Sequence, residues 1–302
     1  MTPEPARPDE LPNAFRLLFH GLPAVEREER VAHALDLVHH GALDPAGIFI
    51  ERGPSGVLGV LVCQPVAGAG ALIWPPQTVA DTHRTAREDR LVQRATRWLR
   101  AQGSKVAQAL LPPSEMALAA SLERNGFQHV THLWYLRHDM EDLTALPDEA
   151  SPLCYQSFAV CVPGLFGVTL QRTYEGTLDC PEVNGARTID EVIAGHQAQG
   201  RFDPDRWWLA LRDGQPVGVM LLSELAESND WEVAYMGLVP EARRQGLGRQ
   251  LLLQALHAAR AAGVRSVTLS VDGRNHPAWQ LYVGTGFVPY DRREVYLAVW
   301  TS

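Results

Sequence analysis

Lysine is almost missing from this chain of 302 residues, which has a single lysine, Lys105, among 27 lysines and arginines. A P-loop that cradles nucleotide phosphates requires a lysine between a glycine and a serine or threonine. Lys105 instead stands between Ser104 and Val106. The sequence therefore excludes a nucleotide-hydrolysing enzyme of the P-loop class.

Cysteine pairs, long apolar runs and excess positive charge are missing as well. The four cysteines show neither CxxC spacing nor a paired framework, so we expect free thiols and no metal site in a cytoplasmic protein. No apolar run approaches the roughly 18–20 residues of a membrane helix, and residues 1–10 are too polar for a secretory signal. The net charge of −8 leaves no basic face for nucleic acid. We expect neither a membrane nor a nucleic acid as a partner.

The C-terminal third alternates between strand and helix patterns. Residues 231–239 are apolar and rich in β-branched or aromatic side chains, and Pro240 ends that strand. Leucines and alanines over 251–259 recur at helical spacing. Further strands are predicted over 264–271 and 293–300, with a short helix between them that begins at His276.

The same pattern occurs earlier in the chain at an offset of 160 residues. Gly263 corresponds to Gly103, the pair Gly286-Phe287 corresponds to Gly126-Phe127, and an apolar stretch stands where the offset predicts a strand. One offset that fits several features indicates an internal repeat. We therefore predict two copies of one α/β unit, residues 1–145 and 151–302, joined where proline, aspartate and glutamate accumulate.

The two copies differ at the positions where chemistry is expected. In the first copy the glycines of the second are replaced and an acid stands in the turn. The corresponding pairs are Arg243 and His83, Gly246 and Ala86, Gly248 and Glu88, Ala278 and Leu118, and Tyr282 and Leu122. We therefore expect the N-terminal copy to keep the fold and to lack the residues that bind the ligand and catalyse the reaction.

The turn from Arg243 to Arg249 has the features of an anion site. Gly246 and Gly248 allow close backbone approach. A helix starts here, so unpaired N–H groups and the positive dipole end face the anion. One alternative is a loop that merely needs positive φ. Another is a dinucleotide-binding turn, which the sequence disfavours because position 251 is leucine and no acid follows until Asp272.

Together these motifs resemble the GNAT superfamily of acyl-CoA N-acyltransferases. The resemblance covers about residues 206–300 and rests on a strand ending in Leu238-Val239-Pro240, the signature Arg243-x-x-Gly246-x-Gly248, Asn275, Tyr282 and Gly286-Phe287. The tandem layout is similar to proteins of the mycothiol synthase type. The resemblance implies an α/β (α+β) fold of two tandem GNAT-like units, each a mixed, mostly antiparallel sheet flanked by helices.

The resemblance also implies how acetyl-CoA, the expected acyl donor, is held. The backbones of Leu238 and Val239 would pair with pantetheine. Asn275 would contact the cofactor arm, or it caps the following helix instead. The pyrophosphate would be bound by backbone amides, with added charge from the arginines, over Arg243, Arg244, Gln245, Gly246, Leu247, Gly248 and Arg249.

Two side chains are the candidates for acid–base catalysis. Tyr282 matches the family tyrosine that donates a proton to the departing thiolate, although a tyrosine on such a helix is otherwise a core residue. Glu232 lies in the run Glu-Val-x-x-x-Gly-x-x-Pro, which resembles mycothiol synthases whose glutamate acts as base. Burial would raise its pKa toward the working pH. The alternative is an edge glutamate that faces water.

The acceptor is expected to lie against residues 172–185. Tyr174, Glu175 and Asp179 in this polar loop would bind an ammonium group, unless the loop is simply solvated. The implied function is an N-acetyltransferase acting on a small-molecule amine or a peptide N-terminus. Two alternatives stay open: a catalytically silent acyl-CoA-binding sensor or scaffold, and a first unit that serves as substrate platform.

Overall fold

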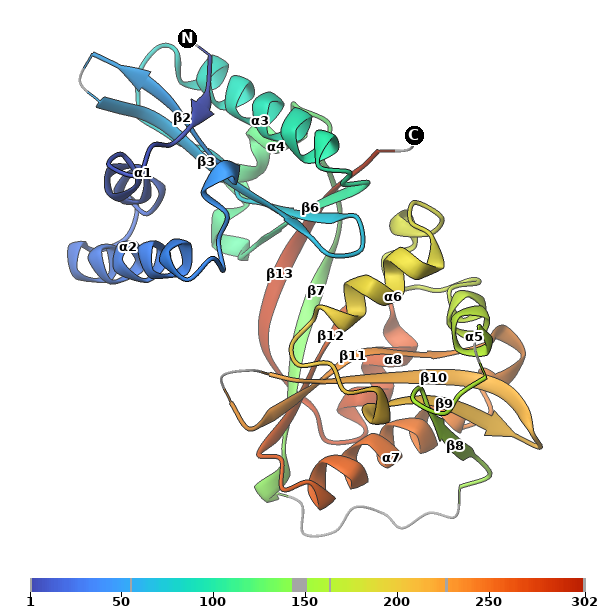
Figure 1. Cartoon of the computed structure of the whole chain (residues 1–302). Coiled ribbons are helices and arrows are strands. Elements are labelled where there is room, and N and C mark those ends of the chain that lie inside the picture. The colour runs from blue at the N-terminus through green and yellow to red at the C-terminus, as the bar shows by residue number, and fades with distance from the viewer. Residues whose placement is uncertain (1, 55, 143–150, 163, 226–227, 301–302) are drawn as a thin grey trace. The chain divides into compact units, whose positions relative to one another are not determined.

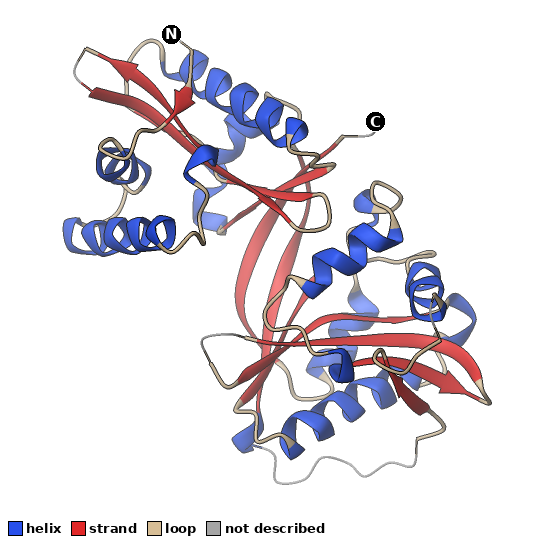
Figure 2. Ribbon diagram, in the orientation of Figure 1, coloured by secondary structure: helices blue, strands red, loops and turns tan. Residues whose placement is uncertain are grey.

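The computed structural model describes residues 2–54, 56–142, 151–162, 164–225 and 228–300 (Figure 1). The chain forms two compact units, one of residues 1–130 with 294–302 and one of residues 131–293. Each is a sheet with helices on both faces (Figure 2). This confirms the predicted fold class of two α/β units with mixed sheets. No helix in the described part of the chain is long and apolar enough to cross a membrane.

The first unit is a mixed sheet in the order β1-β2-β3-β4-β6-β13, and among its described strands only β4 and β6 are parallel. Alternation along β2 places Ile48 and Ile50 against α1 and α2, and Phe49 against α3. The strands are β1 (Glu4–Pro5), β2 (Ile48–Gly53), β3 (Gly56–Val66), β4 (Gly70–Ile73), β5 (Gln77–Thr78), which pairs with β3, β6 (Val106–Leu111) and part of β13 (Val288–Val299). The helices are α1 (Leu11–Leu18), α2 (Ala24–His39), α3 (Arg84–Ala101) and α4 (Ala120–Glu123).

The second unit is a sheet in the order β7-β12-β11-β10-β9-β8, in which β11 and β12 form the one parallel pair of the strands that the structure describes. Helix α7 packs on one face, while α5 and α6 pack on the other (Figure 1). The strands are β7 (Gln128–Asp139), β8 (Cys154–Ser157), β9 (Trp207–Arg212), β10 (Gln215–Glu224), β11 (Asp230–Leu238) and β12 (Ser266–Asp272). The helices are α5 (Leu165–Thr173), α6 (Ile189–Gln197), α7 (Leu247–Ala261) and α8 (His276–Val283).

The last strand of each sequence copy pairs inside the other unit. Leu133–Asp139 of β7 pair with β12, and Glu294–Val299 of β13 pair with β6. The compact units therefore differ from the sequence division at 145 and 151, because a repeat fixes the order of strands but not which sheet each strand enters. We retain 1–145 and 151–302 as a proposal for the two repeat copies. Most of the predicted join lies outside the described residues.

Candidate active site

Strands β11 and β12 separate halfway along their length. Their parallel pairing runs from Asp230 and Ser266 to Val233 and Leu269 and then stops, although both strands continue. A bulge lies at the same level, because Leu221 and Leu222 of β10 face Tyr235 and Val233 and skip the residue between. The second half of β11 is therefore open on the side of β12, the arrangement that a pantetheine arm requires.

The predicted anion turn follows directly. Gly246 is the N-cap of α7 with φ +78°, and Arg244 before it has φ +61°. Within the described chain, the backbone N–H groups of residues 245–248 donate to no protein acceptor. A Cβ at Gly248 would make only ordinary contacts, the nearest 3.5 Å from Leu281. The packing of the protein does not require glycine at position 248, whereas a close-lying anion would.

Side chains fix the turn from outside. Gln245 accepts a hydrogen bond from Arg212 at 2.6 Å and donates one to the Glu241 carbonyl at 2.7 Å. Arg172 forms an ion pair with Glu241. Leu247 is buried in the α7 core, so only its backbone faces the turn. The amides are thus held in place before any ligand arrives.

Arg243 lies elsewhere than expected. Its guanidinium donates to the carbonyl of Leu238 at 3.0 Å, and to those of Thr173 and Gly176 at 2.9 and 3.3 Å. The Val239 N–H donates to Val217 at 3.0 Å. Arg243 therefore joins α5 to the end of β11 and is turned away from the anion turn. The Leu238 carbonyl and the Val239 amide, expected to pair with pantetheine, are bonded to protein.

Tyr282 is placed on α8 with its ring in the core of the second unit. Burial, reinforced by the negative charge of Asp179, raises the pKa of its phenol, so the proton stays on at neutral pH. The hydroxyl bonds to none of the described protein groups, which leaves it available as a donor. Asn275 accepts a hydrogen bond from the Ala278 N–H at 3.3 Å and caps α8, as one expectation stated. Its contact with the cofactor stays a prediction.

Glu232 lies in the middle of the sheet. It faces Ser223 of β10 and Thr268 of β12 in register, so the alternative of an edge glutamate is wrong. Its neighbours Trp231 and Val233 pack into the α7 core, which directs Glu232 to the opposite face. Burial raises the pKa of its carboxyl, as a base working near neutral pH requires.

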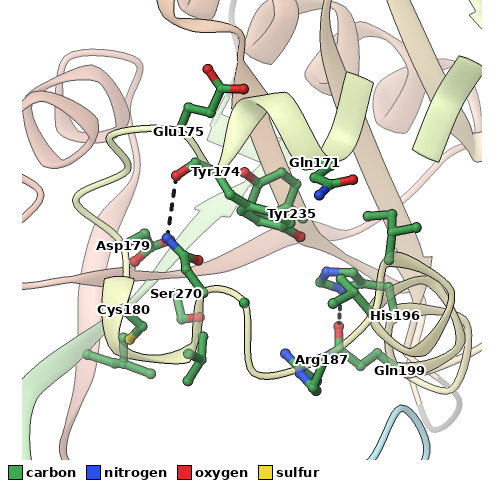
Figure 3. A pocket seen from close by; sticks show the side chains of 16 residues that line it. Gln171, Tyr174, Glu175, Asp179, Cys180, Arg187, His196, Gln199, Tyr235 and Ser270 are labelled. Atoms are coloured by element: carbon green, nitrogen blue, oxygen red, sulfur yellow. Dashed lines mark hydrogen bonds between the residues drawn. The ribbon is translucent and has the colours of Figure 1, made fainter. Parts of the chain in front are cut away.

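A cavity of about 530 Å³ opens on the face of the sheet that carries α5 and α6 (Figure 3). Its floor includes Tyr235 of β11 and Ser270 of β12. Tyr174, Glu175 and Asp179, the three predicted acceptor residues, all line it. The structure thus brings together the residues predicted for the acceptor, and their role stays a prediction.

The loop that carries Asp179 is fastened to the end of β12. The Asp272 N–H donates to Asp179, and the Cys180 N–H donates to Asp272, both at 3.0 Å. Burial alone would raise the pKa of Asp272, but hydrogen bonds from Arg274, Thr131 and the backbone lower it to about 2. Ligand atoms of Asp179, Cys180 and Asp272 lie within 4.8 Å of one another. Both Asp272 oxygens already accept hydrogen bonds, so this cluster fits a metal poorly.

The cavity lining includes residues that sequence reasoning missed, among them Tyr235, His196 and Arg187. Strict alternation from Glu232 places Tyr235 on the α7 face, whereas the bulge turns it into the cavity. Its hydroxyl lies 2.8 Å from Thr173 Oγ1, and its ring lies 5.2 Å from that of Tyr174. Gly237 is needed beside it, because a Cβ there would lie 2.7 Å from both partners. Gly237 was the one signal in the sequence that could have pointed to Tyr235. For His196 on α6 the sequence offered no signal.

The same part of the chain matches a known protein family. Residues 170–287 match the model described as the Acetyltransferase (GNAT) family. This segment is a GNAT domain. It contains the splayed strands and the glycine turn, and the predicted resemblance is confirmed.

Curated relatives of the chain include proteins named mycothiol acetyltransferase. A mycothiol acetyltransferase of Thermomonospora curvata is 40% identical over 191 residues, and one of Beutenbergia cavernae is 34% identical over 185 residues. These stretches cover 58% and 55% of this chain. The chain matches 58% of the length of each relative, which is less than two thirds.

Solved structures share the fold over the whole chain. A GCN5-related N-acetyltransferase from Sphaerobacter thermophilus aligns with a TM-score of 0.61 and 20% identity, covering 98% of this chain and 95% of its own. A tandem GNAT protein from the clavulanic acid biosynthesis pathway aligns with a TM-score of 0.53 and 18% identity, covering 100% and 98%. Both units, and not the GNAT domain alone, therefore have structural counterparts.

Proposed function

We propose that the GNAT domain transfers an acetyl group from acetyl-CoA to a primary amine. The observation that carries the proposal is the coincidence of an opened strand pair with a helix-capping glycine turn whose amides have no protein acceptor. An anion at such a helix start gains from several N–H donors and the helix dipole together. Pantetheine would lie along the open half of β11, with its pyrophosphate on residues 245–249.

The chemistry needs one base and one acid. The amine nitrogen attacks the thioester carbonyl carbon, the new C–N bond forms, and the C–S bond breaks. Glu232 takes the proton that the nitrogen loses, and Tyr282 gives a proton to the departing sulfur. Tyr282 is buried and Glu232 is partly buried, and both have raised pKa values, which suit a carboxylate base and a protonated phenol.

The acceptor is an amine held in the cavity beside Tyr235. Tyr174, Glu175 and Asp179 would hold its ammonium group before the proton is removed. The relatives' name supports a small-molecule amine, with a peptide N-terminus as the other acceptor of this class. We also propose a cytoplasmic location, which the four free thiols support.

Two measurements on the full-length protein test the proposal. Calorimetric titration with acetyl-CoA is expected to show one site, and thiol detection across an amine library is expected to show CoA release. Tight binding of acetyl-CoA without release by any amine would overturn the enzyme and favour the silent sensor or scaffold. Absence of binding would overturn both.

A further inference from the structure

Negatively and positively charged side chains line different sides of the cavity. Of its described lining residues, two are carboxylates, Glu175 and Asp179, and one is an arginine, Arg187. Figure 3 shows Glu175 at the top of the cavity, Asp179 to one side and Arg187 at the bottom, with Tyr235 between. A molecule that fills this space meets negative charge on one side and positive charge on the other.

The chemistry lies at the carboxylate side. Asp179 acts electrostatically on the phenol of Tyr282 and on the hydroxyl of Tyr235, so it lies near the proposed acid. Arg187 acts on the pKa values of His196 and Tyr174, and Asp179 acts on that of Tyr174 as well. Figure 3 places Arg187 on the side of His196, away from Asp179. An acceptor whose amine reaches Tyr282 would therefore have its remote end beside Arg187.

Arg187 is held by the start of α6. The next residue, Thr188, forms a capping box in which its hydroxyl accepts from the Glu191 N–H and the Glu191 carboxylate accepts from the Thr188 N–H. This cap fixes the backbone that presents Arg187, and the side chain is partly buried. An arginine fixed in this way is suited to bind a carboxylate through two parallel hydrogen bonds.

His196 adds shape rather than charge to this wall. Its Nδ1 lies 3.2 Å from Gln199 Oε1, and burial, together with the positive charge of Arg187, lowers the pKa of the imidazole. The ring is therefore neutral at physiological pH. Among the described residues of this wall, Arg187 supplies the positive charge.

We propose that the acceptor of this GNAT domain is an amine that also carries a carboxylate, such as an amino acid, and that Arg187 binds that carboxylate. The proposal rests on the acetyltransferase function proposed above. It assigns to Arg187 the choice of substrate class, while Glu232 and Tyr282 carry out the transfer.

The test is a matched panel of acceptors assayed for CoA release. The panel contains the common L-amino acids, β-alanine and 4-aminobutanoate, each beside its carboxamide, which keeps the amine and removes the negative charge. We expect kcat/KM to be about 10- to 100-fold higher for the acid of an accepted pair, as a charge-assisted hydrogen bond implies. Equal rates for acid and carboxamide would overturn the proposal without touching the proposed function, whereas CoA release by no amine at all would overturn both.

Variants at Arg187 separate substrate choice from folding. Arg187→Gln is expected to lower kcat/KM for the acid by about 10- to 100-fold, mainly through KM, and to leave the carboxamide nearly unchanged. Arg187→Glu is expected to reverse the preference toward diamines such as putrescine. Arg201→Gln, at an exposed arginine outside the cavity, is the control and is expected to change neither. Equal losses for acid and carboxamide in Arg187→Gln, with no reversal in Arg187→Glu, would contradict the assignment.

Discussion

The two units start the corresponding helix at different points of the repeat: α3 begins at Arg84, three residues before the position that corresponds to Leu247, where α7 begins. In the second unit, the helix start at Gly246 presents open amides. In the first unit, position 88 corresponds to Gly248, and the Glu88 carboxylate there is buried and pairs with Arg84 at 2.7 Å and with Arg124 at 3.1 Å. The first unit's acid thus lies inside a helix, four residues after its start, at the position where the second unit has Gly248 in its opening turn.

A parallel strand pair is common to both units. In the first unit, β4 pairs with β6 from Gly70 and Val106 to Leu72 and Gln108, and β4 ends at the next residue, Ile73. The parallel pair therefore belongs to the scaffold, whereas in the second unit both strands continue past the last pair, and the anion site depends on a few residues at one turn. A repeat can lose its ligand site while the fold persists.

The largest expected effect is on acetyl-CoA binding, when Gly248 of the second unit is replaced by the glutamate that the first unit has at the corresponding position. Gly248→Glu is expected to weaken acetyl-CoA binding by more than about 100-fold, because a carboxylate would meet the pyrophosphate and be repelled by it. Calorimetric titration measures the loss, and circular dichroism checks that the fold is kept. Glu88→Gly is the matched change, and it is expected to create no second site, because position 88 lies inside α3, where the backbone amides are bonded within the helix. Unchanged affinity in Gly248→Glu would contradict the assigned anion turn.

Glu232→Gln is expected to lower kcat by about 100- to 10,000-fold with little change in acetyl-CoA affinity. The base works only when ionised, and burial raises its pKa. The wild-type rate is therefore expected to fall with decreasing pH at a higher pH than an ordinary glutamate would cause. Pre-steady-state rates across pH measure both effects, and Glu224→Gln, at a partly buried acid on β10 that pairs with Arg206, is the control. A pH profile that stays the same in Glu232→Gln would remove the base from the mechanism.

Tyr282→Phe is expected to reduce kcat by about 100-fold and to leave acetyl-CoA binding nearly intact, because only the proton donor is removed. The first unit has Leu122 at the corresponding position, buried in its own core. Tyr282→Leu is expected to be as slow as Tyr282→Phe if the hydroxyl alone matters. Steady-state kinetics on both variants measure this, and a rate in Tyr282→Phe equal to that of the wild type would assign the tyrosine to packing.

Local chemistry was predictable from the sequence where one residue type is required. Gly246 has φ +78°, a conformation that favours glycine, and the helix pattern after it marked the turn. Tyr174 and Asp179, which the sequence pointed to in one segment, both line the cavity, and their role with the acceptor stays a prediction. Properties set by distant contacts were not predictable. The charge of Arg243 was visible, but its three carbonyl partners were not, and the bulge that turns Tyr235 into the cavity leaves no mark in the alternation.

The smallest expected effect is on stability, and it is expected in the second unit alone, when Asp272 is replaced. Hydrogen bonds lower the pKa of Asp272 to about 2, so its contribution to stability is present above the ordinary pKa of an aspartate and is lost as pH falls toward 2. The first unit has Pro112 at the corresponding position. Asp272→Asn is therefore expected to lower the free energy of unfolding of the second unit by about 1–3 kcal/mol at neutral pH and to leave the first unchanged. Hydrogen exchange followed by mass spectrometry, read separately for each unit, is expected to show faster exchange around Asp179 and in β12. An equal increase in the hydrogen-exchange rate of both units would mean that they unfold as one cooperative body. The hydrogen bonds of Asp272 would then not stabilise the acceptor cavity separately from the rest of the protein.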